Sequence, residues 1–285
     1  MNSMKDETVP SLRIGMVNFI NTAPIHEIWK KSSHPAGWRV VEAVPSRLNK
    51  MLANGEIDLG FVSSYEYCAR PNQYRILSDL SISANGSVGS VFLFSKTAPE
   101  KLNGCRLLLT NQSETSVSLL KIILEEFYAI KPDYFIGQVS DDLSEEVDGV
   151  LAIGDEALRL VGDVRFRFQI DLGEVWKNHT GLPFVFAICC VRAELCVEEP
   201  QLVRDVHHEL IRCRHQGQED LDSICQLVAS TVPMSQEDCL AYLGGIEYDL
   251  DSEKIKALQA FYKFLIQRGE ASKDSLPLKL ELFED

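Results

Sequence analysis

The sequence predicts a two-lobed α/β protein with a cleft between the lobes. Apolar runs typical of buried strands alternate with segments of helical spacing, which is the pattern of a mostly parallel sheet flanked by helices. Short polar turns follow several of these runs, and from Pro200 onward the chain is nearly all helix. This order favours one lobe made of residues 1–94 and 187–285, with residues 95–186 inserted as a second lobe.

The N-terminal part of the chain contains three apolar runs of strand length. Leu12–Val17 and Ile57–Val62 each end in a polar turn, and Ser90–Ser95 is the third run. Between the first two, Ser46 is placed to cap a helix that ends at Gly55. These segments predict most of the sheet in the first lobe and the strand that leaves it.

A second block repeats the pattern. Arg106–Leu109 and Val150–Ile153 predict strands that are each followed by a helix, and Asp155 is placed to cap the second of these helices. Asp171–His179 predicts a short helix, and Phe184–Val191 is the last long apolar run.

The chain is expected to cross between the lobes near Phe94 and Phe186. A ligand would then lie in the cleft, against the carboxyl ends of strands from both lobes. We therefore expect the protein to close over its ligand by a hinge motion at the two crossings.

The composition argues against several classes of function. The net charge of −14 disfavours nucleic acid as a partner, because such binding depends on Lys and Arg contacts to phosphates. No run approaches the roughly 18–20 apolar residues that cross a membrane. The polar N-terminus lacks the apolar core of a signal peptide, so we expect a cytoplasmic protein.

Metals and cofactors are not expected either. The eight cysteines form no C-x-x-C pair, and the histidines show no metal-ligand spacing. The plain interpretation is a set of free, reduced thiols. The sequence contains no P-loop and no G-x-G-x-x-G motif, so nucleotide binding has no support. The oligomeric state stays open.

The most informative feature is where the small polar residues fall. They follow four apolar runs, each just before a helix, so they can converge in one cleft where helix N-termini and hydroxyl groups meet carboxylates. Taken alone, each turn is typical of an ordinary helix cap. Arg47, next to the expected cap Ser46, is the best-placed cation for a carboxylate, although most arginines in such positions are surface residues. The candidate substrate-binding residues are Arg47, Ser63, Ser64, Thr110, Ser113, Thr115, Ser116, Gly154 and Asp155.

Several long strings of the chain resemble the chorismate dehydratase family of the futalosine route to menaquinone. The resemblance runs in order over about residues 12–195. The strings are IGMVNFINTAPI, VPSRLNKMLANGEIDLGFVSSYEY, DLSISANGSVGSVFLFS, TNQSETSVSLLKIILEE, LAIGDEAL and DLGEVWKNHTGLPFVFAICCVR.

The resemblance implies a type II periplasmic-binding-protein-like fold, without export, and a ligand cleft between the lobes. It implies a hydro-lyase that removes water from chorismate to give 3-[(1-carboxyvinyl)oxy]benzoate. The family's essential Asn falls on Asn21 in NFINTAP, and its pocket Ser falls on Ser90 in GSVGSVFLF. These two are therefore the candidate catalytic residues, although their positions alone also suit a turn former and a strand-edge hydroxyl. His179 stands where the family often has an aromatic residue.

Two other functions remain open. A non-catalytic receptor for small anions can share this fold, but it would normally carry a signal peptide or lipid anchor. The sister enzyme of the same route, a lyase acting on a futalosine derivative, also shares the fold and has a catalytic histidine in its second lobe. Here the strand ends of that lobe show Thr110 and Gly154-Asp155, without a histidine nearby.

The strand-end turns also lack an evident general base. They offer Asn, Ser, Thr and Gly, and their only carboxylate, Asp155, is expected to cap a helix. If the substrate is chorismate, its own enolpyruvyl carboxylate can take the proton instead. The sequence therefore predicts a reaction in which the protein orients the substrate and supplies no base.

Overall fold

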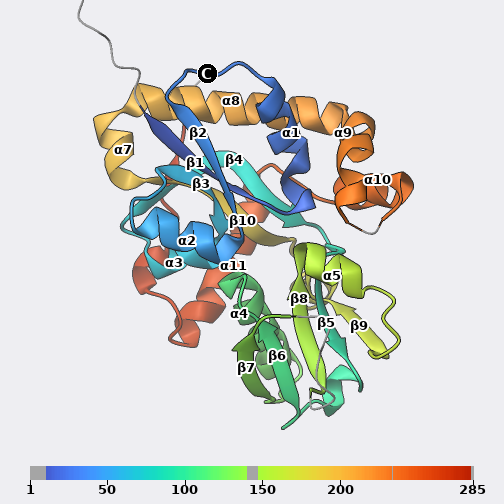
Figure 1. The fold of residues 1–285 in the computed structure, drawn as a ribbon. Coiled ribbons are helices and arrows are strands. Elements are labelled where there is room, and N and C mark those ends of the chain that lie inside the picture. The colour runs from blue at the N-terminus through green and yellow to red at the C-terminus, as the bar shows by residue number, and fades with distance from the viewer. Residues whose placement is uncertain (1–10, 140–146, 233, 284–285) are drawn as a thin grey trace, which may run out of the picture.

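The computed structural model describes residues 11–139, 147–232 and 234–283. It contains two β-sheets, each with helices packed against it, and the six-stranded sheet lies above the five-stranded sheet in Figure 1. We call the six-stranded sheet with its helices lobe one, and the five-stranded sheet with its helices lobe two.

Lobe one is built on strands from both ends of the chain. From one edge to the other its sheet consists of β11 (Leu280–Glu281), β4 (Tyr74–Ala84), β10 (Phe184–Arg192), β3 (Leu59–Ser63), β1 (Leu12–Val17) and β2 (Trp38–Ala43). Lobe two contains β7 (Asp133–Gly137), β6 (Arg106–Thr110), β8 (Gly149–Ile153), β5 (Val91–Ser95) and β9 (Phe168–Asp171).

Both sheets are mixed rather than mostly parallel, which corrects the sequence-based expectation. β1 runs parallel to β2 and β3, and β6 runs parallel to β7 and β8. However, β10 is antiparallel to β3 and β4, and β5 is antiparallel to β8 and β9. These two antiparallel strands are the ones through which the chain enters each sheet after crossing from the other.

The helices of lobe one come largely from the C-terminal part of the chain. They are α1 (Ala23–Lys31), α2 (Pro45–Ala53), α3 (Ser64–Ala69), α7 (Ala193–Glu198), α8 (Pro200–Glu219), α9 (Leu221–Val228), α10 (Gln236–Gly244) and α11 (Ser252–Gln267). Lobe two has α4 (Glu114–Ile122), which continues as a π-helical turn (Ile123–Phe127), with α5 (Gly154–Leu160) and α6 (Leu172–Thr180). Short 3₁₀ turns occur at Ile20–Thr22, Pro99–Lys101, Ala229–Thr231 and Lys273–Ser275.

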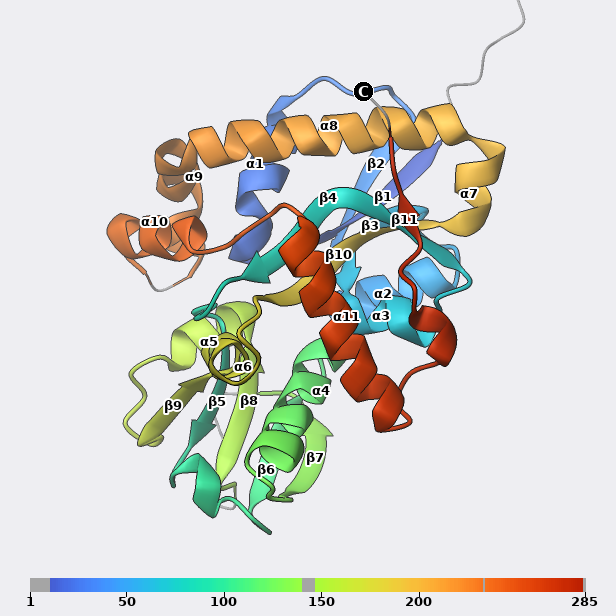
Figure 2. The same ribbon diagram turned by 180° about the vertical axis from the view of Figure 1, so that it is seen from behind.

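The C-terminal helices are held by amphipathic faces. In α8, Val203, Val206, Leu210 and Cys213 recur at helical spacing and are fully buried, and the helix packs against α1. A fully buried aliphatic side chain of this size contributes about 1.5–3 kcal/mol to stability. α11 packs on β10 of lobe one and also on α4 of lobe two, so it bridges both lobes (Figure 2).

The chain crosses between the sheets at residues 85–90, which join β4 to β5, and through α6, which joins β9 to β10. The first crossing therefore precedes Phe94, because the whole of β5 belongs to lobe two. The second ends before Phe186, because β10 begins in lobe one at Phe184. The residue pattern of an apolar run is the same whichever sheet the strand joins. The crossings expected from the sequence are therefore a few residues too far toward the C-terminus.

The Asp171 carboxylate ties the two crossings together. It accepts hydrogen bonds from the Ser87 hydroxyl at 2.7 Å and from the backbone N–H of Val88 and Gly89 at 3.0 and 2.7 Å. On the other crossing it accepts from Gly173 N at 2.9 Å, as the N-cap of α6. The hinge motion of the two lobes at these crossings stays a prediction.

Ser46, the residue expected to cap α2, is not its N-cap residue. The helix begins at Pro45, with Val44 as its N-cap residue, because proline suits the first position of a helix. The backbone N–H of Ser46 donates instead to the carbonyl of Gln112 in lobe two, at 2.9 Å. The predicted cap is therefore a contact between lobes.

Candidate active site

A cavity lies where the two lobes meet. The space free of protein atoms there is about 500 Å³, part of which is open to solvent. Six of the sequence-predicted site residues line it, namely Asn21, Ser63, Ser90, Ser113, Ser116 and Gly154. The remaining lining residues are Val17, Phe19, Pro45, Ile82, Val88, Val91, Ile153, Phe186 and Ala187. Among the described residues that line this cavity, none carries a titratable side chain.

Asn21 reaches the cavity through the turn after β1. The Thr22 hydroxyl fixes this turn by donating to the carbonyls of Val17 and Phe19, at 2.6 and 3.0 Å. The Asn21 side-chain oxygen is buried, and it has no hydrogen-bond partner in the part of the chain that the structure describes. Because a buried polar atom without a partner costs about 1–3 kcal/mol, this amide is suited to a ligand that can complete its hydrogen bonding.

Ser90 is the last residue of the first crossing, directly before β5. It is buried and lines the cavity from lobe two. Its carbonyl accepts from Gly154 N at 2.7 Å, which brings the turns after the crossing and after β8 together. Gly154 has a φ of +54°, in the left-handed region that favours glycine.

The Ser63 hydroxyl is oriented by a residue that the sequence reasoning missed. Asn49 of α2 donates to Ser63 Oγ at 2.8 Å, and its side-chain oxygen accepts from Ser63 N at 3.1 Å. The same amide donates to the Glu114 carboxylate of lobe two at 3.1 Å. Asn49 is buried, so it holds one cavity hydroxyl and also joins the lobes.

The first turn of α4 borders the cavity with two hydroxyl groups. Ser113 is the N-cap residue, and its hydroxyl accepts from Ser116 N at 3.3 Å and lies 3.2 Å from Ser116 Oγ. The N-terminus of a helix carries a partial positive charge and free N–H groups. This end of α4 can therefore favour an anionic group although no cationic residue lines the cavity among the described residues.

Arg47 lies away from the site. Its side chain is 60% exposed, and its guanidinium lies 3.5 Å from the Glu56 carboxylate on the surface. On α2 the buried face carries Leu48, Asn49 and Leu52, so Arg47 points to another side of the helix. The expectation that it binds a carboxylate in the cleft is not supported.

Three of the predicted hydroxyl residues do not line the cavity, and their hydroxyl groups form hydrogen bonds with backbone groups instead. Ser64 donates to the carbonyl of Val185 at 2.7 Å, and Thr110 accepts from Gln112 N at 3.2 Å. Thr115 accepts from Tyr65 N at 2.8 Å and so links the two lobes. Thr110 instead lines a separate surface depression.

Asp155 does not cap α5, which corrects the expectation from the sequence. The N-cap residue is Ile153, and Asp155 lies in the first turn of the helix. Its carboxylate accepts from Ile20 N in lobe one at 3.3 Å, outside the cavity lining. Burial raises the pKa of this carboxyl group, and the hydrogen bond from Ile20 partly opposes the rise.

The two lobes are in direct contact beside the cavity in this structure. The bonds between Ser46 and Gln112, between Tyr65 and Thr115, and between Ile20 and Asp155 all run from lobe one to lobe two. Phe19 of lobe one also packs against Gly154 of lobe two, because a Cβ added to this glycine would lie 2.8 Å from the aromatic ring.

This site can now be compared with known proteins. A family model described as menaquinone biosynthesis matches residues 12–267. The chain belongs to this family. It is 33% identical over 267 residues to a chorismate dehydratase of Thermus thermophilus, covering 88% of this chain and 94% of the relative. It is 30% identical over 255 residues to a chorismate dehydratase of Campylobacter jejuni, covering 87% and 95%.

Solved structures show the fold of this family member. A protein of Archaeoglobus fulgidus superposes with a TM-score of 0.73 at 20% identity, covering 91% of this chain and 98% of its own. The alkanesulfonate-binding protein of Xanthomonas axonopodis bound to MOPS gives 0.69 at 16% identity, with 94% and 96% covered. A Candida albicans protein with the generic periplasmic binding protein fold gives 0.62 at 13% identity, with 97% and 99% covered. The predicted periplasmic-binding-protein-like fold is confirmed.

Three further features concern His179, metal-ligating groups and membrane-spanning helices. His179 lies outside the cavity lining, and its ring stacks on Phe127 with centroids 4.6 Å apart. In the described ranges no group of three or more His, Cys, Asp and Glu residues could hold a metal ion. Likewise, no helix in the described part is both long and apolar enough to cross a membrane.

Proposed function

We propose that this protein dehydrates chorismate to 3-[(1-carboxyvinyl)oxy]benzoate. The observation that carries the proposal is the character of the cavity between the lobes, which offers an amide, several hydroxyl groups and a helix N-terminus, but no titratable side chain among its described lining residues. Membership of the menaquinone biosynthesis family, with chorismate dehydratases as relatives, supports the choice of substrate.

The apolar part of the cavity suits a ring, and the polar part suits its substituents. Phe19, Ile82 and Phe186 provide apolar surface, whereas Asn21 and the serines provide hydrogen bonds. Chorismate carries two carboxylates and a C4 hydroxyl. The first turn of α4, with Ser113 and Ser116, is our candidate for holding a carboxylate by helix N–H groups and hydroxyls.

The reaction requires removal of the C3 proton and departure of the C4 hydroxyl. The enolpyruvyl carboxylate of the substrate takes the proton, and the C3–H electron pair forms the new C3–C4 double bond. The C4–O bond breaks, and the hydroxide leaves as water after it receives that proton. Effective molarities for such well-oriented internal groups reach about 10⁵ M or more, so an internal base is sufficient.

The protein then lowers the barrier by orientation and by hydrogen bonding. Negative charge that develops in the ring spreads into the ring carboxylate, where N–H and O–H donors stabilise it. The Asn21 side-chain oxygen, which lacks a partner among the described residues, can accept from the C4 hydroxyl and so fix the orientation of the bound substrate. Ser90 is the candidate donor on the opposite lobe.

The sister lyase and the receptor are the competing functions. The sister enzyme uses a catalytic histidine, and no histidine is among the described residues that line the cavity. A receptor would bind chorismate without converting it. The test is to incubate purified protein with chorismate and to follow the mass of the product. A product lighter by one water supports the proposal; binding without conversion supports a receptor and overturns it.

We also propose a cytoplasmic location. All eight cysteines are free thiols in the structure, including the adjacent Cys189 and Cys190. Free thiols are typical of proteins in a reducing compartment.

Asp155→Asn should retain most of the dehydratase activity. The asparagine oxygen can still accept from Ile20 N, and Asp155 does not line the cavity. Burial raises the pKa of Asp155, so its protonated carboxyl group stabilises the fold at pH values below the pKa in the unfolded state. This stabilisation is lost as the pH rises through the pKa in the folded state. The variant should therefore lose this dependence and be no less stable at pH 7. Steady-state rates and thermal unfolding across pH check this, and loss of turnover by about 100-fold or more would make Asp155 the base.

A further inference from the structure

The end of α10 and the segment that follows it lie behind residues that line the candidate active site. Glu247 pairs with Ser83 of β4 in an antiparallel bridge, with N–H to carbonyl distances of 2.9 Å in both directions. Ser81 N donates to the carbonyl of Tyr248 at 2.8 Å. These bonds extend the sheet of lobe one and hold Glu247 and Tyr248 in place, just after α10 ends at Gly244.

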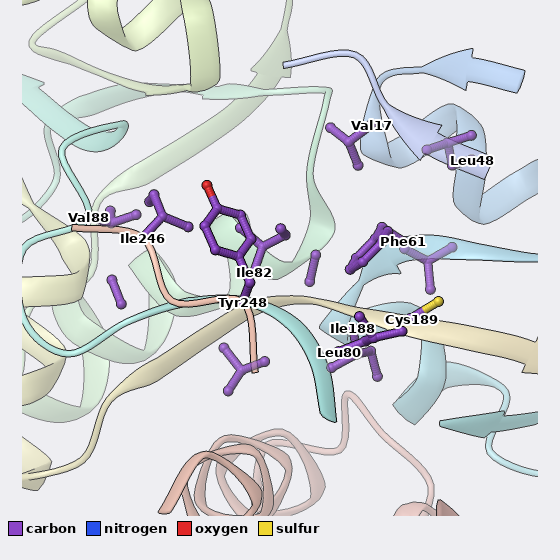
Figure 3. Close-up of a cluster of buried hydrophobic side chains, with 14 of the residues drawn as sticks. Val17, Leu48, Phe61, Leu80, Ile82, Val88, Ile188, Cys189, Ile246 and Tyr248 are labelled. Carbon is purple, nitrogen blue, oxygen red and sulfur yellow. The ribbon is translucent and has the colours of Figure 1, made fainter. Parts of the chain in front are cut away.

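Tyr248 supports the turn that carries Asn21. Its ring is buried among apolar neighbours that include Ile82, Val88 and Ile246, and its hydroxyl points out of that cluster (Figure 3). The hydroxyl donates to the Asn21 carbonyl at 2.9 Å. The backbone of Asn21 is thus held from behind while its side chain faces the cavity.

Tyr242 stands behind the other candidate catalytic residue. A Cβ added to Gly89 would lie 3.3 Å from the Tyr242 ring, so the ring packs directly against the chain beside Ser90. The Tyr242 hydroxyl oxygen is buried, without a partner at hydrogen-bond geometry among the described residues. Burial raises the pKa of this phenol, and the Ser90 side chain partly opposes the rise.

Packing alone does not explain these two hydroxyl groups. Phenylalanine would fill the same space without burying a hydroxyl group, which is unfavourable unless that group is hydrogen-bonded. The Tyr248 hydroxyl is bonded to the Asn21 carbonyl, whereas the Tyr242 hydroxyl has no partner among the described residues. The Tyr248 hydroxyl bonds Asn21, which lines the cavity, and the Tyr242 ring packs on Gly89, the chain neighbour of Ser90, which also lines it.

We propose that Tyr242 and Tyr248 are positioning residues that orient Ser90 and Asn21, respectively, for the elimination. The proposal rests on the dehydratase function proposed above. It assigns a catalytic role to a segment about 150 residues or more from either candidate in sequence. The segment acts through hydroxyl groups behind the cavity wall rather than by contact with the substrate.

The test uses Tyr242→Phe and Tyr248→Phe, which remove only the hydroxyl groups. Each should lower kcat for chorismate about tenfold, because a candidate catalytic residue that is held slightly out of place loses part of its effect, with KM within about twofold. Tyr67→Phe is the matched control, because Tyr67 is equally buried and its hydroxyl accepts from Lys279 N at 2.9 Å, away from the cavity. Its kcat should be that of wild type.

Double variants separate positioning from a general structural role. If Tyr242 acts through Ser90, Tyr242→Phe should have no further effect on kcat in a Ser90→Ala background, and Tyr248→Phe should likewise add nothing to Asn21→Ala. Unchanged kcat in both single variants, or effects that simply add to those of Ser90→Ala and Asn21→Ala, would overturn the proposal while leaving the dehydratase function intact. A wild-type protein that does not convert chorismate would overturn the dehydratase function itself, and this proposal with it.

Discussion

Asn21→Ala is expected to lower kcat/KM for chorismate by about 10²–10³-fold, the effect of losing one well-placed polar group at a site of developing charge. The substitution removes the amide that faces the cavity but keeps the backbone carbonyl that accepts from Tyr248. The fold should therefore be retained, and thermal unfolding should change little. Steady-state kinetics with chorismate measures the effect.

Asn54→Ala is the control for this variant. Asn54 lies at the end of α2, where its amide donates only to the exposed Glu56 carboxylate at 3.1 Å. Ser90→Ala should behave like Asn21→Ala, and Ser95→Ala serves as its control, since Ser95 is equally buried at the other end of β5 and donates to Thr97 O. Near wild-type turnover in both Asn21→Ala and Ser90→Ala would remove these residues from the mechanism.

Gly154→Ala is expected to lower kcat/KM by about 10–100-fold by preventing full closure of the cavity. The added methyl group would lie 2.8 Å from the Phe19 ring, which must then move away from lobe two. Overpacking of this kind costs about 1–3 kcal/mol, and here it acts only on the closed form. Kinetics and solution scattering with saturating ligand measure the loss and the incomplete compaction.

Gly162→Ala separates closure from backbone strain. Gly162 also has a left-handed φ, +82°, but a Cβ there would meet nothing within 4 Å. Gly162→Ala should lose stability as Gly154→Ala does, because a positive φ is unfavourable for alanine, but it should keep wild-type turnover. Equal loss of activity in the two glycine variants would show that strain, not contact with Phe19, is responsible.

The sequence was most informative about the strand ends. Asn21, Ser63, Ser90 and Gly154 follow or precede buried runs, and all of them line the cavity, because strand ends of both sheets meet there. Family strings, rather than spacing, distinguished Asn21 and Ser90 from ordinary turn residues.

Sequence patterns could not predict which of two neighbouring hydroxyl residues faces the cavity. Ser63 faces the cavity while Ser64 donates to β10, and Ser116 faces it while Thr115 bonds Tyr65. Which of two adjacent hydroxyls faces a cavity depends on partners that are distant in sequence.

The supporting residues were missed for the same reason. Asn49 lies on what reads as an ordinary helix, and Tyr242 and Tyr248 come from the C-terminal region, which carries no motif. Asp155 looked like a cap because it begins a helix, yet its carboxylate reaches Ile20 in the other lobe. Contacts between lobes leave no periodic signal in the sequence.

The most direct test of a base-free cavity uses a chorismate analogue in which only the enolpyruvyl carboxylate is esterified. The ring carboxylate and the C4 hydroxyl remain, so the analogue should still bind, which calorimetry measures. If the substrate carboxylate is the base, the bound ester should not lose water at a rate above that in buffer. Dehydration of the ester at a rate near that of chorismate would contradict this mechanism and would require a base from the protein.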